Sequence, residues 1–232
     1  MQLSRADVLT LLREGDIELL GLMPDSSNYT FGVIVTAGET KTLAVYKPEE
    51  GEMPLWDFPD GTLWRREIAA YVLSEALGWG FVPPTVAREG PHGIGSLQLY
   101  VEHDPEEHYF SLMPAFADTF RRIAAFDVVC NNADRKGGHC LLEREPGRIW
   151  VVDHGVCFHE EPKLRTVIWD FAGERLPEDV LKDLHDLDAR ALEEWLEPAE
   201  VDAVVARAAR LADEGIFPAP PEARRAYPWP PV

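Results

Sequence analysis

The chain has 232 residues, and its 41 acidic against 22 basic side chains give a formal net charge of −19. This balance leaves too little positive charge for the basic face that nucleic-acid binding or docking onto an anionic membrane requires, so neither is predicted. No apolar run approaches the roughly 20 residues that cross a bilayer, and the first five residues lack the apolar stretch of a secretory signal. We therefore expect a cytoplasmic protein with no stable membrane insertion.

Cysteine usage agrees with that location. Cys130, Cys140 and Cys157 include no C-x-x-C pair, and an odd number leaves at least one thiol outside any intrachain disulfide. We expect reduced, buried thiols. The length suffices for a large core, as one extended domain or as two lobes, and nothing in the sequence indicates an oligomeric state.

The first hundred residues alternate β-branched and aromatic runs with turn formers, which is typical of an antiparallel sheet. Ser4 is the expected N-cap of a short helix that ends before Gly15. Strands are predicted at residues 17–21, 29–35, 42–48, 81–86 and 95–101.

The turn-rich segment 24–28 joins the first two of these strands, so its small polar residues lie at a hairpin tip. The backbone N–H groups and side chains of Ser26, Ser27 and Asn28 could line a concavity that binds an anion. The segment contains no glycine, so an ordinary hairpin turn is an equally good interpretation.

Two charged residues follow this hairpin, one near the end of a predicted strand and one on the next predicted helix. Lys47 lies near the end of the strand at 42–48, and an amphipathic helix predicted at 63–77 carries Glu67 beside its apolar stripe. The strand resembles the V-A-I-K strand of kinases, and this resemblance implies that Glu67 forms an ion pair with Lys47. The alternative is that both are ordinary solvated charges of an acidic protein.

The chain turns polar at Glu102, a change that is typical of a hinge between two lobes. We therefore predict an N-lobe at residues 16–102 and a mainly helical C-lobe at residues 103–216. The segment at 217–232 is rich in proline, so it is either a tail wrapped over the body or a docking segment. Helices of the C-lobe are expected at residues 116–130, 177–187 and 199–214.

The segment from Phe126 to Phe158 carries the strongest chemical signal in the chain. A helical pattern gives way to a loop, and two short apolar runs joined by a Glu-Pro-Gly turn predict a β-hairpin at residues 140–152. The ends of that hairpin bring Asp134 and His139 toward Asp153. Two carboxylates and an imidazole at one mouth form a site for a hard cation and a phosphate.

The spacing within this segment matches that of kinases. Asp134 and His139 have the spacing of the D-x-x-x-x-N catalytic loop, and Asp153-His154-Gly155 stands where kinases carry D-F-G. The Asp-Arg opening of the loop together with D-H-G resembles the phosphatidylinositol 3-/4-kinase-like superfamily, in particular its small bacterial members. The resemblance covers residues 16–175. It implies a single kinase-like domain over residues 1–232, of the α+β class, with two lobes: an antiparallel-sheet N-lobe and a mainly helical C-lobe.

The resemblance also implies a nucleotide, ATP, and roles for individual residues. Lys47 would contact the phosphates with Glu67 orienting it, and Asp153 would be the principal ligand of Mg²⁺ or Mn²⁺. Asp134 would orient the acceptor hydroxyl and accept its proton. His139 stands in place of the usual asparagine and would be a metal ligand that favours Mn²⁺ more than an amide does.

The same resemblance suggests how ATP would be held. The hairpin tip at residues 24–28 would cover the phosphates, as serine-containing loops of the superfamily do. Arg135 and Lys136 would offset phosphate charge unless they pair with neighbouring acids. The residues implied near adenine are Val101, Glu102 and Leu141, which would supply backbone hydrogen bonds and apolar walls.

We therefore expect ATP-dependent transfer of the γ-phosphoryl group to a hydroxyl acceptor. Lys163 and Arg165 are the only lysines or arginines between Asp153 and Arg175, so a protein serine or threonine, or a small soluble alcohol, is favoured over a membrane lipid. Two alternatives stay open: a catalytically silent pseudokinase that binds a nucleotide or a partner, and a metal-dependent phosphohydrolase. The hydrolase would hold its ion with His139, Asp153, His154 and His159.

Overall fold

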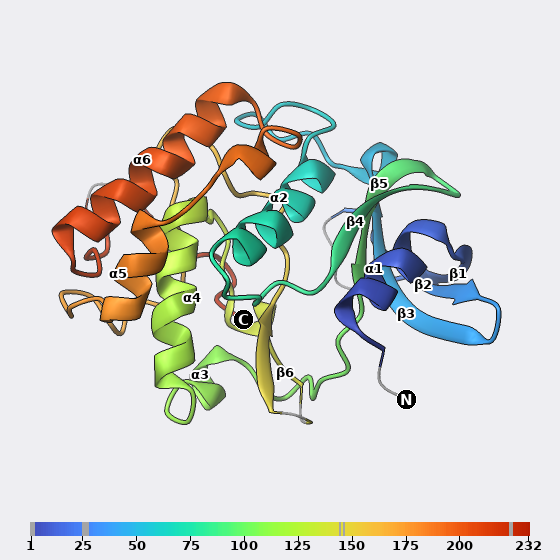
Figure 1. The fold of residues 1–232 in the computed structure, drawn as a ribbon, viewed down its shortest axis with the longest axis horizontal. Coiled ribbons are helices and arrows are strands. Elements are labelled where there is room, and N and C mark those ends of the chain that lie inside the picture. Colours follow the sequence, from blue (N-terminus) through green and yellow to red (C-terminus); the bar gives the residue numbers. More distant parts are fainter. Residues whose placement is uncertain (1–2, 25–27, 144, 146, 223–224) are drawn as a thin grey trace.

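The computed structural model describes residues 3–24, 28–143, 145, 147–222 and 225–232. These residues form a two-lobed, kinase-like fold of the α+β class, which confirms the predicted fold class. Figure 1 shows the antiparallel sheet and α1 as the smaller lobe on the right, and α4, α5 and α6 in the larger lobe on the left.

The sheet comes first in the chain and helices dominate later. The helices are α1 (Arg5–Glu14), α2 (Leu63–Ala76), α3 (Tyr109–Leu112), α4 (Ala117–Cys130), α5 (Glu178–His185) and α6 (Pro198–Glu214). The strands are β1 (Asp16–Leu22), β2 (Phe31–Ala37), β3 (Thr40–Pro48), β4 (Thr85–Gly90), β5 (Gly93–Leu99), β6 (Cys140–Glu143) and β7 (Arg148–Val151). Short 3₁₀ turns are η1 (Glu49–Gly51), η2 (Gly137–His139) and η3 (Arg190–Leu192).

The sheet of the smaller lobe has the strand order β1-β2-β3-β5-β4, with every neighbouring pair antiparallel. Successive side chains of a strand point to opposite faces of a sheet. In β3, Ala44 and Tyr46 are buried in the core that α1 covers, whereas Val45 and Lys47 point the other way and line the cleft between the lobes. This register decides which β3 side chains can reach a ligand.

The helix α1 begins where the sequence predicts. The Ser4 hydroxyl accepts the N–H of Asp7, and the Asp7 carboxylate accepts the N–H of Ser4 in return, each at 3.2 Å. Leu12 is fully buried against the sheet. At Gly15 the chain passes so close to β2 that a Cβ atom would lie 2.7 Å from Val35, so a larger residue would push α1 off the sheet.

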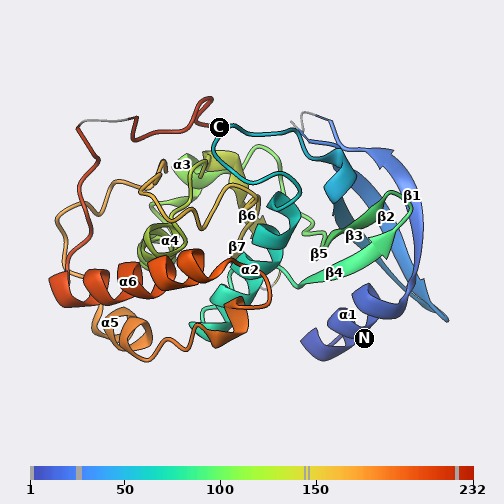
Figure 2. The same cartoon turned by 90° about the horizontal axis from the view of Figure 1, so that it is seen from above.

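The helix α2 lies between the lobes: its apolar side chains join the core of the larger lobe, and its backbone runs close to β4 and β5. Ala69, Ala70 and Leu73 belong to the same apolar cluster as Phe126 of α4, while the sheet and α1 form a separate cluster. Figure 2 shows α2 lying between the sheet and the helices α4 and α6. Burial of a leucine such as Leu73 contributes about 2 kcal/mol, so this packing fixes α2 to the larger lobe.

The predicted strand at residues 81–86 was wrong in its bounds. Pro83 and Pro84 have no N–H to donate to a ladder, and β4 begins only after them. Phe81 lies in the core of the larger lobe instead. The hairpin of β4 and β5 turns at Gly93, whose φ of 84° suits glycine.

The second hairpin confirms the prediction for residues 140–152. Cys140 of β6 pairs with Val151 of β7 in an antiparallel ladder, so the two ends of the hairpin lie side by side. The predicted state of the thiols is also confirmed, since Cys130, Cys140 and Cys157 are free and buried.

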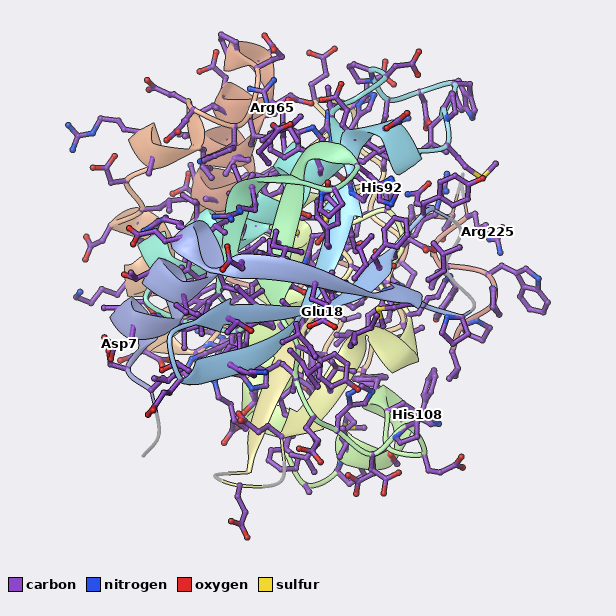
Figure 3. The ribbon with its side chains drawn as sticks, turned by 90° about the vertical axis from the view of Figure 1, so that its right-hand side faces the viewer. Asp7, Glu18, Arg65, His92, His108 and Arg225 are labelled. Carbon is purple, nitrogen blue, oxygen red and sulfur yellow. The ribbon has the colours of Figure 1, made fainter. Side chains whose placement is uncertain are left out.

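The proline-rich segment lies on the body of the protein. Residues 217–222 and 225–232 contain no helix or strand. The carbonyl of Ala226 accepts the N–H of Thr166 at 3.1 Å, and that of Pro231 accepts the N–H of Gly137 at 2.7 Å. Figure 3 places Arg225 and His108 along one side of the molecule, with Glu18 on the sheet toward the viewer. Among the described residues, no helix combines the length and the apolar character that a membrane span requires.

Candidate active site

A cleft of about 470 Å³ separates the lobes and is lined from both sides. The sheet contributes Lys47, α2 contributes Glu67, and the loop after α4 contributes Asp134 and His139. Asp153 enters from the segment that follows β7. The structure therefore brings the predicted catalytic and metal-binding residues into one cleft.

Lys47 is the centre of this group. Its ammonium donates to Glu67 Oε1, which confirms the predicted ion pair, and to Asp153 Oδ1 at 2.9 Å. Burial by itself would lower the pKa of Lys47, but the charges of Asp153 and Glu67 outweigh that effect and raise the pKa. The lysine is therefore charged throughout the physiological pH range.

Glu67 joins the two lobes through its second oxygen. Its side chain is only 3% exposed, and Oε2 accepts the backbone N–H of His154 at 3.0 Å. One carboxylate thus holds the β3 lysine with one oxygen and the D-H-G segment with the other. No sequence pattern predicts the contact with the His154 backbone, because any residue at position 154 other than proline offers the same N–H.

Asp153 adopts a backbone conformation that L-residues seldom use, with φ of 63°. Its Oδ2 lies 3.3 Å from Nε2 of His139, and its side chain is half exposed toward the cleft. The positive charge of Lys47 holds the pKa of Asp153 well below its ordinary value. The carboxylate is therefore ionised and ready to coordinate a cation.

His139 supplies a neutral nitrogen beside that carboxylate. Burial lowers the pKa of His139 to about 4, more than the charge of Asp153 opposes, so the imidazole carries no charge at neutral pH. A carboxylate oxygen and a neutral imidazole that face one cleft fit a divalent cation, with phosphate oxygens and water completing its shell. The donor set suits Mn²⁺ at least as well as Mg²⁺.

Asp134 lies at the same mouth with its side chain one-third exposed. Its N–H donates to the buried Asn132 side chain at 2.9 Å, and Lys136 Nζ lies 3.3 Å from its carboxylate. Burial raises the pKa of Asp134 above the ordinary value, although Lys136 opposes the shift. A carboxylate whose basicity is raised in this way is better suited to accept a proton.

Two roles were expected for Arg135: offsetting phosphate charge or pairing with a neighbouring acid. The structure shows the second, and burial keeps the side chain away from the phosphates. It is fully buried, and it donates from Nε and Nη2 to the Asp127 carboxylate at 3.0–3.1 Å. It also donates to the Val152 carbonyl at 2.9 Å and contacts His154 Nε2 at 2.7 Å. Arg135 therefore anchors the catalytic loop to α4 and to the D-H-G segment.

The apolar end of the cleft includes two of the three residues predicted near adenine. Val101 and Leu141 line it, whereas Glu102 is exposed and falls outside the lining set of the described residues. The Val101 carbonyl is within 2.8 Å of His103 Nδ1. Asn28 lines the cleft and accepts the N–H of Met53 at 2.8 Å. Ser26 and Ser27 lie outside the described residues.

The structure does not bring together the four side chains that the phosphohydrolase alternative requires to hold its ion. Within the described parts of the chain, no group of three or more His, Cys, Asp or Glu side chains is placed to hold an ion. His154 is fully buried against Arg135. His159 packs edge-on against Phe58 at 5.3 Å, and its Nδ1 accepts the N–H of Glu161.

The two-lobed fold and the Lys–Glu–Asp contact across its cleft define a protein of the kinase-like class. Residues 84–194 match the family described as phosphatidylinositol 3- and 4-kinase. The chain belongs to the phosphatidylinositol 3-/4-kinase-like superfamily. It is 39% identical to the protein Rv2133c of Mycobacterium tuberculosis, over 97% of this chain and 96% of that protein.

Other relatives share smaller parts or the fold alone. Phosphatidylinositol 4-kinase gamma 4 of Arabidopsis thaliana is 28% identical over 65% of this chain, which spans only 33% of that kinase. The structure of hydra Fam20 with sugar has a TM-score of 0.59 at 15% identity and covers 90% of this chain and 87% of its own. The Golgi casein kinase with Mn/ADP bound has a TM-score of 0.53 at 16% identity, and the match covers 98% of this chain and 80% of that kinase chain.

Proposed function

We propose that the protein is an ATP-dependent phosphotransferase that moves the γ-phosphoryl group of ATP to a hydroxyl acceptor. One observation carries the proposal: the Lys47 ammonium contacts both Glu67 and Asp153 inside the cleft. Three chain segments from two lobes converge there, and Glu67 is almost fully buried. Solvated surface charges would not be arranged in this way.

Each of these side chains takes a part in holding ATP. Lys47 contacts the phosphates, and Glu67 keeps its ammonium directed into the cleft. The adenine ring packs at the apolar end, against Val101 and Leu141. Asp153 and His139 hold Mg²⁺ or Mn²⁺, which when bound neutralises charge on the β- and γ-phosphate oxygens. The Mn/ADP complex of the structurally similar Golgi casein kinase supports this choice of ligands.

Asp134 acts on the acceptor. Its carboxylate orients the acceptor hydroxyl toward the γ-phosphorus and takes up the hydroxyl proton. The new O–P bond forms as the bond between the γ-phosphorus and the β,γ-bridging oxygen breaks, and ADP leaves with that oxygen. Lys136, at 3.3 Å from Asp134, keeps the carboxylate in place.

The acceptor we favour is a protein serine or threonine, or a small soluble alcohol. Lys163, one of the two lysines or arginines between Asp153 and Arg175, is paired with Asp57 at 2.8 Å and does not face an acceptor freely. Arg165 alone is a weak site for a lipid phosphate in a chain of net charge −19. The name of the plant relative points to phosphatidylinositol, so that lipid is the contrasting acceptor to test.

ADP release from ATP tests the proposal. The wild type is assayed with Mn²⁺ or Mg²⁺, with and without a cell lysate as the source of acceptor, and with phosphatidylinositol vesicles. The variant Asp153→Asn is compared with Asp188→Asn, which changes an exposed aspartate paired with Arg190. We expect metal-dependent turnover that Asp153→Asn lowers about 100-fold or more, as loss of a metal ligand should, and that Asp188→Asn leaves unchanged.

Two results would count against the proposal. If Asp153→Asn left turnover unchanged, the reaction would not take place in the cleft. ATP binding without any turnover in the lysate would instead favour the pseudokinase alternative. Faster turnover with phosphatidylinositol vesicles than with the lysate would support the phosphotransferase activity but show that the favoured acceptor is wrong.

A further inference from the structure

The segment at residues 225–232 contains no helix or strand, and it is attached to the larger lobe at two points. At the first point the carbonyl of Ala226 accepts the backbone N–H of Thr166 at 3.1 Å and the indole N–H of Trp169 at 3.2 Å. At the second point the carbonyl of Pro231 accepts the N–H of Gly137 at 2.7 Å. We call residues 225–232 the strap segment.

The small residues of the strap segment are buried, and its large aromatic residues are not. Ala226 is 9% exposed and Pro228 is buried, whereas Tyr227 and Trp229 are 51% and 75% exposed. Main-chain bonds and small buried side chains therefore hold the segment in place. One substitution at Ala226 can break this attachment, and a similar change at its neighbour Tyr227 can leave it intact.

The first attachment point borders the catalytic loop. Arg135 pairs with the chain around Thr166: its N–H donates to the Arg165 carbonyl at 3.0 Å, and its carbonyl accepts the N–H of Val167 at 3.1 Å. Thr166 lies between these two bonds and donates its own N–H to the strap segment. Because Arg135 directly follows Asp134 in the chain, the strap segment supports the backbone beside the proposed catalytic carboxylate.

The second attachment point lies within the catalytic loop itself. Gly137 is buried and stands between Asp134 and His139 in the chain. A Cβ atom at Gly137 would lie 3.1 Å from the Phe110 ring and 3.4 Å from the Pro231 carbonyl. This turn is packed between α3 and the strap segment, so both attachments restrain the loop that carries Asp134.

The strap segment leaves the nucleotide cleft open. Among the described residues, none of those at 225–232 lines the cleft. His139 is also tied to Val152 by a backbone bond of 3.1 Å, and Lys47 contacts Asp153 directly. Release of the strap segment should therefore disturb Asp134 more than the groups that hold ATP and its metal.

We propose that the strap segment positions the catalytic loop for phosphoryl transfer, so that it governs the turnover number and not the affinity for the nucleotide. The proposal rests on the phosphotransferase function proposed above. A carboxylate must stay within hydrogen-bond reach of the acceptor hydroxyl to take up its proton, and a displacement of about 1 Å can lower a rate about 100-fold. The strap segment acts through the backbone of Thr166 and Gly137 rather than through a contact with the nucleotide.

Matched substitutions in the full chain test this role. Ala226→Glu places a charged side chain at a buried position and should expel the strap segment, because burial of an unpaired carboxylate is strongly unfavourable. Tyr227→Glu adds the same charge at the next, exposed position and is the control. Trp169→Phe is a milder second variant, which removes the indole bond to Ala226 and keeps an aromatic ring. Thermal melts verify that each variant is folded.

Three quantities are measured on each protein. They are kcat with saturating ATP, Mn²⁺ and the lysate acceptor, the Kd for a non-hydrolysable ATP analogue with Mn²⁺, and amide hydrogen exchange in peptides that cover residues 132–139 and 165–169. We expect Ala226→Glu to lower kcat about tenfold or more, to change the Kd less than about threefold, and to speed exchange in both peptides. Trp169→Phe should change kcat and exchange in the same direction by a smaller factor, and Tyr227→Glu should match the wild type in all three.

Three outcomes would overturn the proposal. Faster exchange of the loop in Ala226→Glu with an unchanged kcat would show that the strap segment does not position Asp134. A higher kcat would show that the segment covers the acceptor site instead. A Kd weakened as strongly as kcat would show a general loss of structure.

A wild type without turnover would count against the phosphotransferase function and leave the strap segment to be judged by exchange alone. In that case, unchanged exchange in Ala226→Glu would overturn its hold on the catalytic loop, and faster exchange in both peptides would support it.

Discussion

The Lys47 ammonium lies 2.9 Å from Asp153 Oδ1, although the two residues are 106 positions apart in the chain. Glu67 accepts from the same ammonium and is only 3% exposed. Removing the lysine would leave a buried carboxylate without its counter-ion, and such a loss is far more harmful than removal of the whole pair. The three residues therefore form one energetic unit.

This unit makes a prediction about stability. Lys47→Met should lower the free energy of unfolding by on the order of 2–3 kcal/mol, somewhat less than for a fully buried pair because Lys47 is partly exposed. The double variant Lys47→Met/Glu67→Gln should regain most of that loss while remaining inactive. Urea unfolding of the wild type, both single variants and the double variant measures the coupling. Strictly additive effects would show that the ion pair contributes nothing.

Arg66, the neighbour of Glu67, fixes α2 to the larger lobe. It is 2% exposed and donates to the Cys157 carbonyl at 2.7 Å and to the Glu200 carboxylate, while its guanidinium lies 4.9 Å from the Phe58 ring. Arg66→Met should destabilise the protein by about 3 kcal/mol, because it leaves Glu200 and a buried carbonyl unpaired. The matched variant Arg65→Met should cost less than about 1 kcal/mol. Equal effects in thermal unfolding would contradict a clamping role for Arg66.

We expect His139 to determine which metal supports turnover. His139→Asn replaces a borderline nitrogen ligand by a harder amide oxygen, so Mg²⁺-supported turnover should rise several-fold relative to Mn²⁺-supported turnover. Because both rates are measured on one enzyme preparation, their ratio does not depend on the concentration of active enzyme. An unchanged ratio would mean that residue 139 does not touch the metal.

The thiols offer a prediction that is independent of activity. Burial raises the pKa of Cys140 to about 12 and holds that of Cys157 well above its ordinary value. Iodoacetamide at pH 8 should therefore modify none of the three buried cysteines in the folded protein and all three after unfolding, as counted by mass spectrometry. Labelling of the folded protein at Cys140 would contradict its burial.

The same shift predicts a pH dependence of stability. In the unfolded chain the Cys140 thiol ionises near its ordinary pKa of 9, whereas in the folded protein it stays protonated up to about 12. The unfolded state therefore gains stability relative to the folded state as the pH rises from 9 to 12. Cys140→Ala, which lacks this group, should lose less stability than the wild type between pH 8 and pH 10 in urea unfolding. An equal loss would show that another group dominates.

Local patterns in the sequence were sufficient to predict much of the scaffold. The N-cap at Ser4 and the hairpin at residues 140–152 follow from residue types in a local pattern, and the pairing of Lys47 with Glu67 follows from the resemblance to kinases. The strand at residues 81–86 failed because its apolar content outweighed the two prolines that cannot join a ladder.

The contacts that the sequence did not reveal are non-local. Arg66 and Arg135 resemble ordinary surface charges, and only the fold shows that each is buried against a specific carboxylate. Glu67 reaches the backbone of His154, which no side-chain pattern encodes.

Binding of a nucleotide to the cleft tests directly whether Lys47 and Asp153 hold ATP there. A non-hydrolysable ATP analogue is titrated calorimetrically with Mn²⁺ into the wild type, Lys47→Met, Asp153→Asn and the control Asp188→Asn. We expect one analogue bound per chain in the wild type and the control, with affinity at least about tenfold weaker in the other two, which is about 1.4 kcal/mol or more. Equal affinity in all four proteins would show that Lys47 and Asp153 do not hold a nucleotide.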